Sequence, residues 1–194
     1  KYQLESNRAA YGAHLGRLFG AEVHLECISG IGMCKNSNDV SSDASPRNMS
    51  AYVHATAPFD GVDPAGLGAG SSSGRRPRAV WDYGAWRPDV LLINLGTNDF
   101  GFSSIVKTRS PTVEAYADAY VAFVTRLFAD EGRRYRRNET KVLLLCGPMT
   151  DRYCAALEGV EARLVASGVE SARATLAGTA GEMRGCMMHP GPTQ

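Results

Sequence analysis

Two short apolar runs stand out in the pattern of hydrophobic and polar positions along the chain. Residues 90–95 read VLLINL, and residues 142–145 read VLLL. Runs of this length are typical of strands that are buried on both faces of a parallel sheet. The segment between them carries apolar side chains at helical spacings of four, three and four: Tyr116, Tyr120, Phe123 and Leu127. The pattern therefore predicts a strand, an amphipathic helix and a second strand.

Weaker patterns extend this order on both sides. Residues 7–20 predict a helix that ends at Gly20, with Tyr11, Leu15 and Leu18 on one face. Residues 21–29 alternate toward a strand, and residues 170–178 are weakly strand-like. A further helix is marked by four side chains: Tyr153, Leu157, Val160 and Leu164. Alternating helices and strands indicate an α/β fold with a mostly parallel sheet. We find no internal repeat, and residues 1–194 form one predicted domain.

Composition narrows the classes of partner. Residues 35–78 are rich in Ser, Gly, Pro, Asn and Asp and predict a long surface excursion, whose flexible part is residues 66–78. The net charge is +1 with 21% charged residues, so we expect no nucleic-acid partner. No apolar run reaches the roughly 20 residues of a membrane span, so we expect no membrane partner. The chain begins at Lys1 and not at Met, so a missing signal peptide says little about the compartment.

The five cysteines do not define a disulfide by their spacing. Cys27 and Cys146 lie in apolar, strand-like runs, where a small buried thiol is expected. The other three lie in loops or near the ends of elements, and one pair among them could be a disulfide: Cys34, Cys154 and Cys186.

Three polar stretches follow predicted strands and hold the candidate catalytic residues. They are ISGIGM with Gly30, GTND with Asn98 and GCMMHP with His189. Each alone is better explained as a turn, a local hydrogen bond or a structural histidine. Together they fit acyl transfer, which needs hydrogen-bond donors for an oxyanion and an imidazole that moves a proton. In GTND, we expect Gly96 to permit a tight turn and Asp99 to brace the loop.

These stretches resemble the SGNH hydrolases, the superfamily of GDSL-like esterases. The similarity extends from about Tyr11 to Pro190 and is most specific in residues 81–100 (WDYGAWRPDVLLINLGTNDF). Within the superfamily, the chain is most similar to the acetyl esterases of carbohydrate esterase family two. The resemblance implies a flavodoxin-like, three-layer α/β/α fold and ester hydrolysis without a metal or cofactor. It implies that Gly30 and Asn98 form the oxyanion hole and that His189 is the general base and acid.

The chain departs from the family's pattern in three places. The nucleophilic serine belongs to a Gly-Asp-Ser stretch on the first strand, and no such stretch occurs here, so we expect it upstream of Lys1. Cys186 occupies the position three residues before the histidine where many members carry an aspartate, a residue that family-two esterases also tend to lack. The chain ends soon after the His-Pro pair, where a closing helix is usual. We therefore expect a domain that is incomplete at both ends, poorly stable and inactive on its own.

Three functions remain open at this point. The first is an O-acetyl esterase of a sugar or polysaccharide, secreted as the resemblance favours. The second is a lipid esterase or thioesterase of the same superfamily, and the third is a non-catalytic SGNH-like binding domain. Trp81, Tyr83 and Trp86 could line a sugar site, although packing before a strand is the favoured interpretation. A metal site at Cys186 and His189 is set aside because the pair supplies only two ligands. The oligomeric state stays undetermined.

Overall fold

A three-stranded parallel sheet forms the centre of the computed structural model. Its strands run in the order β1-β2-β3. They are β1 Val90–Ile93, β2 Lys141–Cys146 and β3 Ser171–Thr175. Leu92 pairs with Leu143 of β2, and Leu144 pairs with Arg173 of β3. The structure describes residues 8, 10–37, 39, 48–52, 84–101, 110–129 and 135–176.

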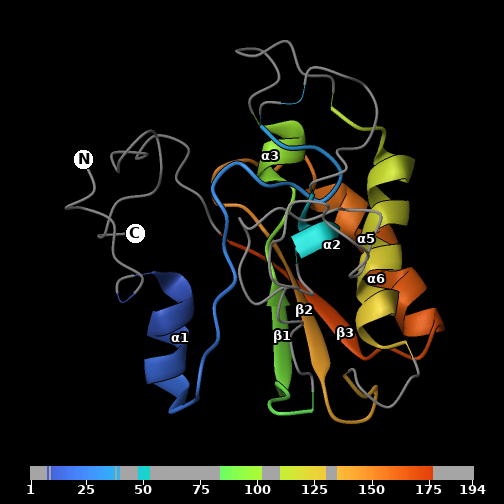
Figure 1. Ribbon diagram of the computed structural model, residues 1–194. Helices are drawn as coiled ribbons and strands as arrows, with labels where there is room; N and C mark the ends of the chain where they lie inside the picture. The colour runs from blue at the N-terminus through green and yellow to red at the C-terminus, as the bar shows by residue number, and fades with distance from the viewer. Residues whose placement is uncertain are drawn as a thin grey trace, which may run out of the picture.

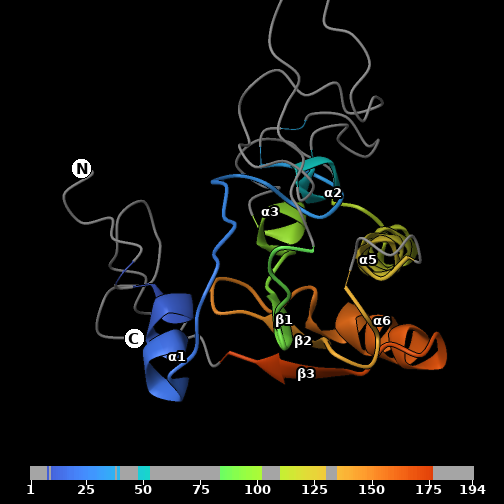
Figure 2. The ribbon, with the colours of Figure 1, turned by 60° about the horizontal axis from the view of Figure 1, so that its bottom comes forward.

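Two helices cover one face of this sheet, α5 (Val113–Leu127) and α6 (Cys154–Ala166) (Figures 1 and 2). α5 connects β1 to β2, and α6 connects β2 to β3. The hydroxyl of Thr112 caps α5 by accepting a hydrogen bond from the Ala115 amide at 3.1 Å. Parallel strands joined by helices confirm the predicted α/β fold.

The core lies between these helices and β2, as the apolar spacings predict. The four predicted side chains of α5 and the four that mark α6 are all buried. Tyr153 belongs to this set, although it precedes the first helical turn and occupies the N-cap position of α6. Helical periodicity worked here because each helix has one face that packs on the sheet.

The first helix, α1 (Tyr11–Phe19), forms as predicted but does not bury its apolar face. It ends at Gly20 in the left-handed conformation, with φ +60°. Yet Tyr11 is 48% exposed and Leu18 is 75% exposed. In Figure 1, α1 stands apart from the sheet and lies along the segment that follows it, while the side chain of Tyr11, its first residue, lies near Asn94 at the end of β1. Gly12 lies against Leu25, and Gly16 lies against Val23.

Two strand predictions are wrong in detail. Residues 21–28 are extended but form no strand, because no described strand lies beside them to complete a backbone ladder. β1 forms where predicted, but Val90 is 54% exposed and within β1 only Ile93 is buried. β1 is an edge strand of the described sheet, and α6 packs against β2 and β3 rather than β1.

The excursion from residue 35 lies mostly outside the described residues. Its described part includes the short helix α2 (Met49–Tyr52), which is too short to leave a periodic pattern in the sequence. None of the helices in the described ranges has the length and apolar character needed to cross a membrane.

The cysteine predictions need correction. Cys146 is joined to Cys154 by a disulfide, with a Cα–Cα distance of 5.3 Å. Cys146 is therefore no free thiol, and Cys27 is exposed because its segment joins no sheet. Cys34 is a buried free thiol, and Cys186 lies outside the described residues.

Candidate active site at the carboxyl edge of the sheet

The GTND stretch turns sharply at the end of β1 and forms the short helix α3 (Thr97–Phe100). Gly96 adopts φ +140°, a conformation that favours glycine. A Cβ atom at this position would lie 2.5 Å from the Tyr153 ring. The turn expected at Gly96 is thus confirmed, and both its conformation and its surroundings require glycine.

Asp99 braces this turn against a distant loop, which confirms the second expectation for GTND. Its carboxylate accepts hydrogen bonds from the backbone amides of Met33 (2.9 Å), Cys34 (2.7 Å) and Lys35 (2.8 Å). The side chain is only 3% exposed. Burial raises the pKa of Asp99, and these three amides oppose that rise. Asp99 therefore ties the glycine-rich loop after residue 28 to the end of β1.

Replacing Asp99 by alanine is expected to lower the free energy of unfolding by at least about 2 kcal/mol. The substitution leaves three buried amide donors without an acceptor, and each unsatisfied group costs roughly 1–3 kcal/mol before relaxation. Urea denaturation measures the change. Asp89→Ala, at an exposed position, is the matched control and should change stability by less than about 0.5 kcal/mol. Equal effects of the two variants would contradict the bracing role.

Asn98 and Gly30 are brought together at the same edge. The Asn98 side-chain amide donates a hydrogen bond of 2.7 Å to the carbonyl of Ile31, the residue after Gly30. Gly30 adopts φ +81°, and its carbonyl accepts a hydrogen bond from the Ser37 amide at 2.9 Å. The second amide hydrogen of Asn98 and the Gly30 N–H donate to none of the described residues. Among the described residues, two donors without an acceptor thus stand on these two loops.

The third candidate, His189, lies outside the described residues, as do Cys186, Trp81 and Tyr83. Trp86 is described, is half-buried and stacks on the His24 ring, with 3.9 Å between ring centroids. It precedes β1 in the chain, whereas Asn98 follows this strand.

Two tyrosines that support the site were assigned only to the core by the sequence pattern. The Tyr153 hydroxyl donates to Asn94 Oδ1 at 3.0 Å, and the Tyr116 hydroxyl donates to the Leu95 carbonyl. Both hydroxyls therefore hold the residues that lead into Gly96. Helical spacing predicts only that such side chains are buried, and contains no signal for the atoms that their hydroxyls reach.

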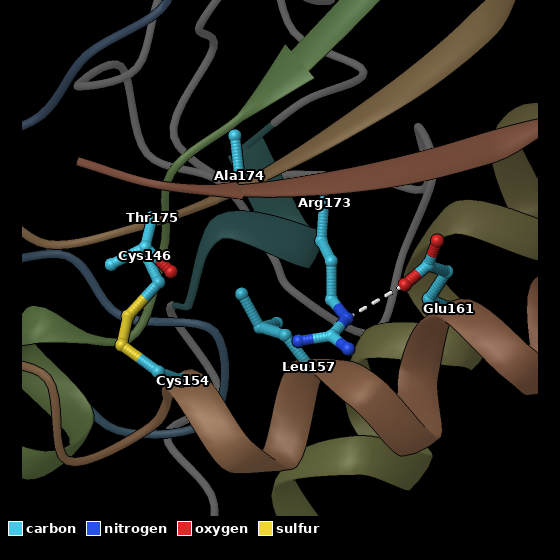
Figure 3. A pocket seen from close by; sticks show the side chains of 7 residues that line it. All are labelled: Cys146, Cys154, Leu157, Glu161, Arg173, Ala174 and Thr175. Carbon is cyan, nitrogen blue, oxygen red and sulfur yellow. Dashed lines mark hydrogen bonds and ion pairs between the residues drawn. A yellow bond between two sulfur atoms is a disulfide. The ribbon is translucent and has the colours of Figure 1, made fainter.

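An open hollow lies between α6 and β3 (Figure 3). It is lined by the disulfide and by five other residues: Leu157, Glu161, Arg173, Ala174 and Thr175. The Arg173 guanidinium donates to Glu161 at 2.8 Å, so its charge is paired. Neither Gly30 nor Asn98 lines this hollow. Within the described ranges, no three His, Cys, Asp or Glu side chains gather as metal ligands.

The fold is the α/β fold of carbohydrate esterases, which the chain resembles in sequence and structure. An acetyl xylan esterase (Est2A) from the rumen bacterium Butyrivibrio proteoclasticus superposes with a TM-score of 0.72 and 21% identity, over 97% of this chain and 52% of that chain. A carbohydrate esterase whose active site displays divergent catalytic and non-catalytic binding functions superposes with a TM-score of 0.69 and 22% identity, over 97% and 50%.

Curated relatives are esterases as well. An acetylxylan esterase/glucomannan deacetylase of Cellvibrio japonicus is 26% identical over 136 residues, which make up 68% of this chain and 32% of that protein. The cellulase/esterase CelE of Acetivibrio thermocellus is 28% identical over 147 residues, or 75% of this chain and 14% of that protein. The chain thus spans a third or less of the length of these relatives. No protein-family model matches it.

Proposed function

We propose that the protein to which this chain belongs is an O-acetyl esterase of sugars or polysaccharides. The observation that carries the proposal is the hydrogen bond from Asn98 to the carbonyl of Ile31, which holds an asparagine amide against the loop that contains Gly30. The Asn98 amide and the Gly30 N–H both lie at the carboxyl edge of a parallel sheet, where ligands bind in α/β folds. The sequence similarity to acetylxylan esterases supports the same activity.

In the proposed reaction, a serine hydroxyl attacks the acetyl carbonyl carbon while His189 takes the hydroxyl proton. The carbonyl oxygen becomes an oxyanion, which accepts hydrogen bonds from Gly30 N–H and the free amide hydrogen of Asn98. The C–O bond to the sugar then breaks, and His189 returns the proton to the departing sugar oxygen. Water, deprotonated by His189, attacks the acetyl-serine and releases acetate and the free serine. The steps require no metal or cofactor.

The chain does not contain the Gly-Asp-Ser stretch that is expected to carry the nucleophilic serine. The proposal places this serine elsewhere in the whole protein. The chain alone is therefore expected to be inactive. Activity is therefore to be measured on the whole protein.

The proposed substrate class is an acetylated carbohydrate rather than a lipid ester or a thioester. Two relatives from Cellvibrio japonicus are named acetylxylan esterase/glucomannan deacetylase. The excursion after residue 35 is rich in Gly, Ser and Asn, and does not suggest the apolar groove that a long acyl chain needs. The proposal includes no nucleic-acid or membrane partner.

Acetate release by the whole protein distinguishes the three functions left open by the sequence. We expect it from acetylated xylan or glucomannan, with turnover on the order of 1–10³ s⁻¹. Faster hydrolysis of p-nitrophenyl palmitate or of acetyl-coenzyme A would overturn the carbohydrate assignment in favour of the lipid esterase or thioesterase. Binding of the polysaccharide without any acetate release would overturn the enzymatic role and leave a binding domain.

A further inference from the structure

Three hydrogen bonds join the ends of β1 and β2 to the beginning of α6. The Tyr153 hydroxyl donates to Asn94 Oδ1 at 3.0 Å and accepts from the Gly147 amide at 3.1 Å. The Asn94 side-chain amide donates to the Gly147 carbonyl at 3.0 Å. Tyr153 is fully buried, at 0% exposure. Asn94 is half-buried, and the three hydrogen bonds together hold these groups in one arrangement.

The same tyrosine fills the inside of the turn that leads to Asn98. Its ring occupies the space that a side chain at Gly96 would need, and it stacks on Phe100 with 6.4 Å between ring centroids. The Thr97 side chain lies near its hydroxyl and lowers the pKa of that group. Tyr153 thus contacts the chain both before and after Gly96.

The hydroxyl acts as a permanent hydrogen-bond donor. Burial raises the pKa of Tyr153, and the nearby Thr97 side chain and the Gly147 amide offset only part of that rise. The hydroxyl is therefore protonated throughout the pH range in which an esterase with a histidine base would work.

A disulfide fixes the two segments that Tyr153 joins. Cys146 directly precedes Gly147, and Cys154 directly follows Tyr153 (Figure 3). The carboxyl end of β2 and the start of α6 are thus linked covalently within one residue of the hydrogen-bond network. This link limits how far the Tyr153 ring can move away from Gly96.

We propose that Tyr153 is a positioning residue that aims the Asn98 amide. It acts through Asn94, Thr97 and Gly96, while Asp99 holds the same turn from the other side. The inference rests on the proposed function, in which Asn98 stabilises the oxyanion. A donor displaced by a fraction of an ångström loses much of its value in the transition state, whereas binding of the substrate's sugar is unaffected.

Tyr153→Phe in the whole protein tests this role, because it keeps the ring and removes only the hydroxyl. We expect kcat for acetyl ester hydrolysis to fall about tenfold, with KM changed less than about twofold, since part of one oxyanion donor is lost. We also expect backbone amides at residues 97–101 to exchange hydrogen at least about fivefold faster. The matched control is Tyr120→Phe. Tyr120 is equally buried, and its hydroxyl donates to the Ile93 carbonyl at 3.4 Å rather than to the turn at Gly96, so the substitution should change neither quantity.

The two readouts separate this inference from the proposed function. If the wild-type protein hydrolyses no ester, the proposed function fails, and the exchange measurement alone decides whether Tyr153 holds the turn. An unchanged exchange rate in Tyr153→Phe would overturn the positioning role. If the wild-type protein is active, an unchanged kcat in Tyr153→Phe would also overturn the role. The same holds if the variant is less stable but keeps the wild-type kcat per folded molecule.

Discussion

Replacing His189 by alanine is expected to lower acetate release by the whole protein at least about 10⁴-fold. The proposed reaction uses the imidazole in each of its steps: it takes the serine proton, protonates the departing sugar and activates water. Without it, the serine hydroxyl stays protonated and is a weak nucleophile. Initial rates on acetylated glucomannan and on p-nitrophenyl acetate measure the loss.

His14→Ala is the matched control for this prediction. His14 is exposed on α1, away from the sheet, and its substitution should leave the rate within about twofold of wild type, as is usual for surface changes. A His189→Ala protein that retained a tenth of the wild-type rate would remove His189 from the role of general base.

Replacing Asn98 by alanine is expected to lower kcat on the order of 10²–10³-fold, the cost of one lost oxyanion donor. KM should change little, because the amide acts on charge that develops only in the transition state. The variant loses one hydrogen bond to the Ile31 carbonyl, which costs about 1 kcal/mol of stability and should leave the protein folded.

The matched control is Asn138→Ala, which alters an exposed asparagine in the turn before β2. It should reproduce wild-type kinetics. A loss below about tenfold in Asn98→Ala would exclude this side chain from the oxyanion hole, since a lost donor costs more than that.

The periodicity of apolar residues predicted the helices and strands whose apolar faces pack in the core. α5, α6 and β2 follow their apolar positions because each has a face that packs against the others. Residues 21–28 alternate in the same manner but form no strand, since pairing depends on a partner strand that lies elsewhere in the sequence. The apolar face of α1 remains exposed for a similar reason. A helical pattern specifies which residues share a face of the helix, but not which other element packs against that face.

In the candidate site, too, local conformation could be predicted from the sequence, but contacts between distant segments could not. The turn at Gly96 and the bracing by Asp99 could be predicted, because glycine followed by short polar residues has few other uses after a strand. The groups that Asp99 binds could not be predicted, since they lie 64 to 66 residues earlier. Cys146 was expected to be a free thiol because its partner Cys154 belongs to another element, and only the fold brings the two together.

For Tyr153, the sequence predicts burial but not the hydrogen-bond partners of its hydroxyl. Its spacing with Leu157 predicts burial, and burial is what the structure shows. Its hydroxyl lies between Asn94 and Gly147. This position depends on how β1, β2 and α6 pack together, which the sequence spacing does not specify. The Gly96 position offers an indirect signal, since a glycine in this turn leaves room for a large ring.

The central claim is that the carboxyl edge around Gly30 and Asn98 belongs to an enzyme that removes acetyl groups from carbohydrates. The most direct measurement is the release of acetate from acetylated glucomannan by the whole protein, compared with its Asn98→Ala variant under the same conditions. The account predicts steady release by the wild type and a rate about 10²–10³-fold lower in the variant. Equal rates for the two proteins, or no release by the folded wild type, would contradict it.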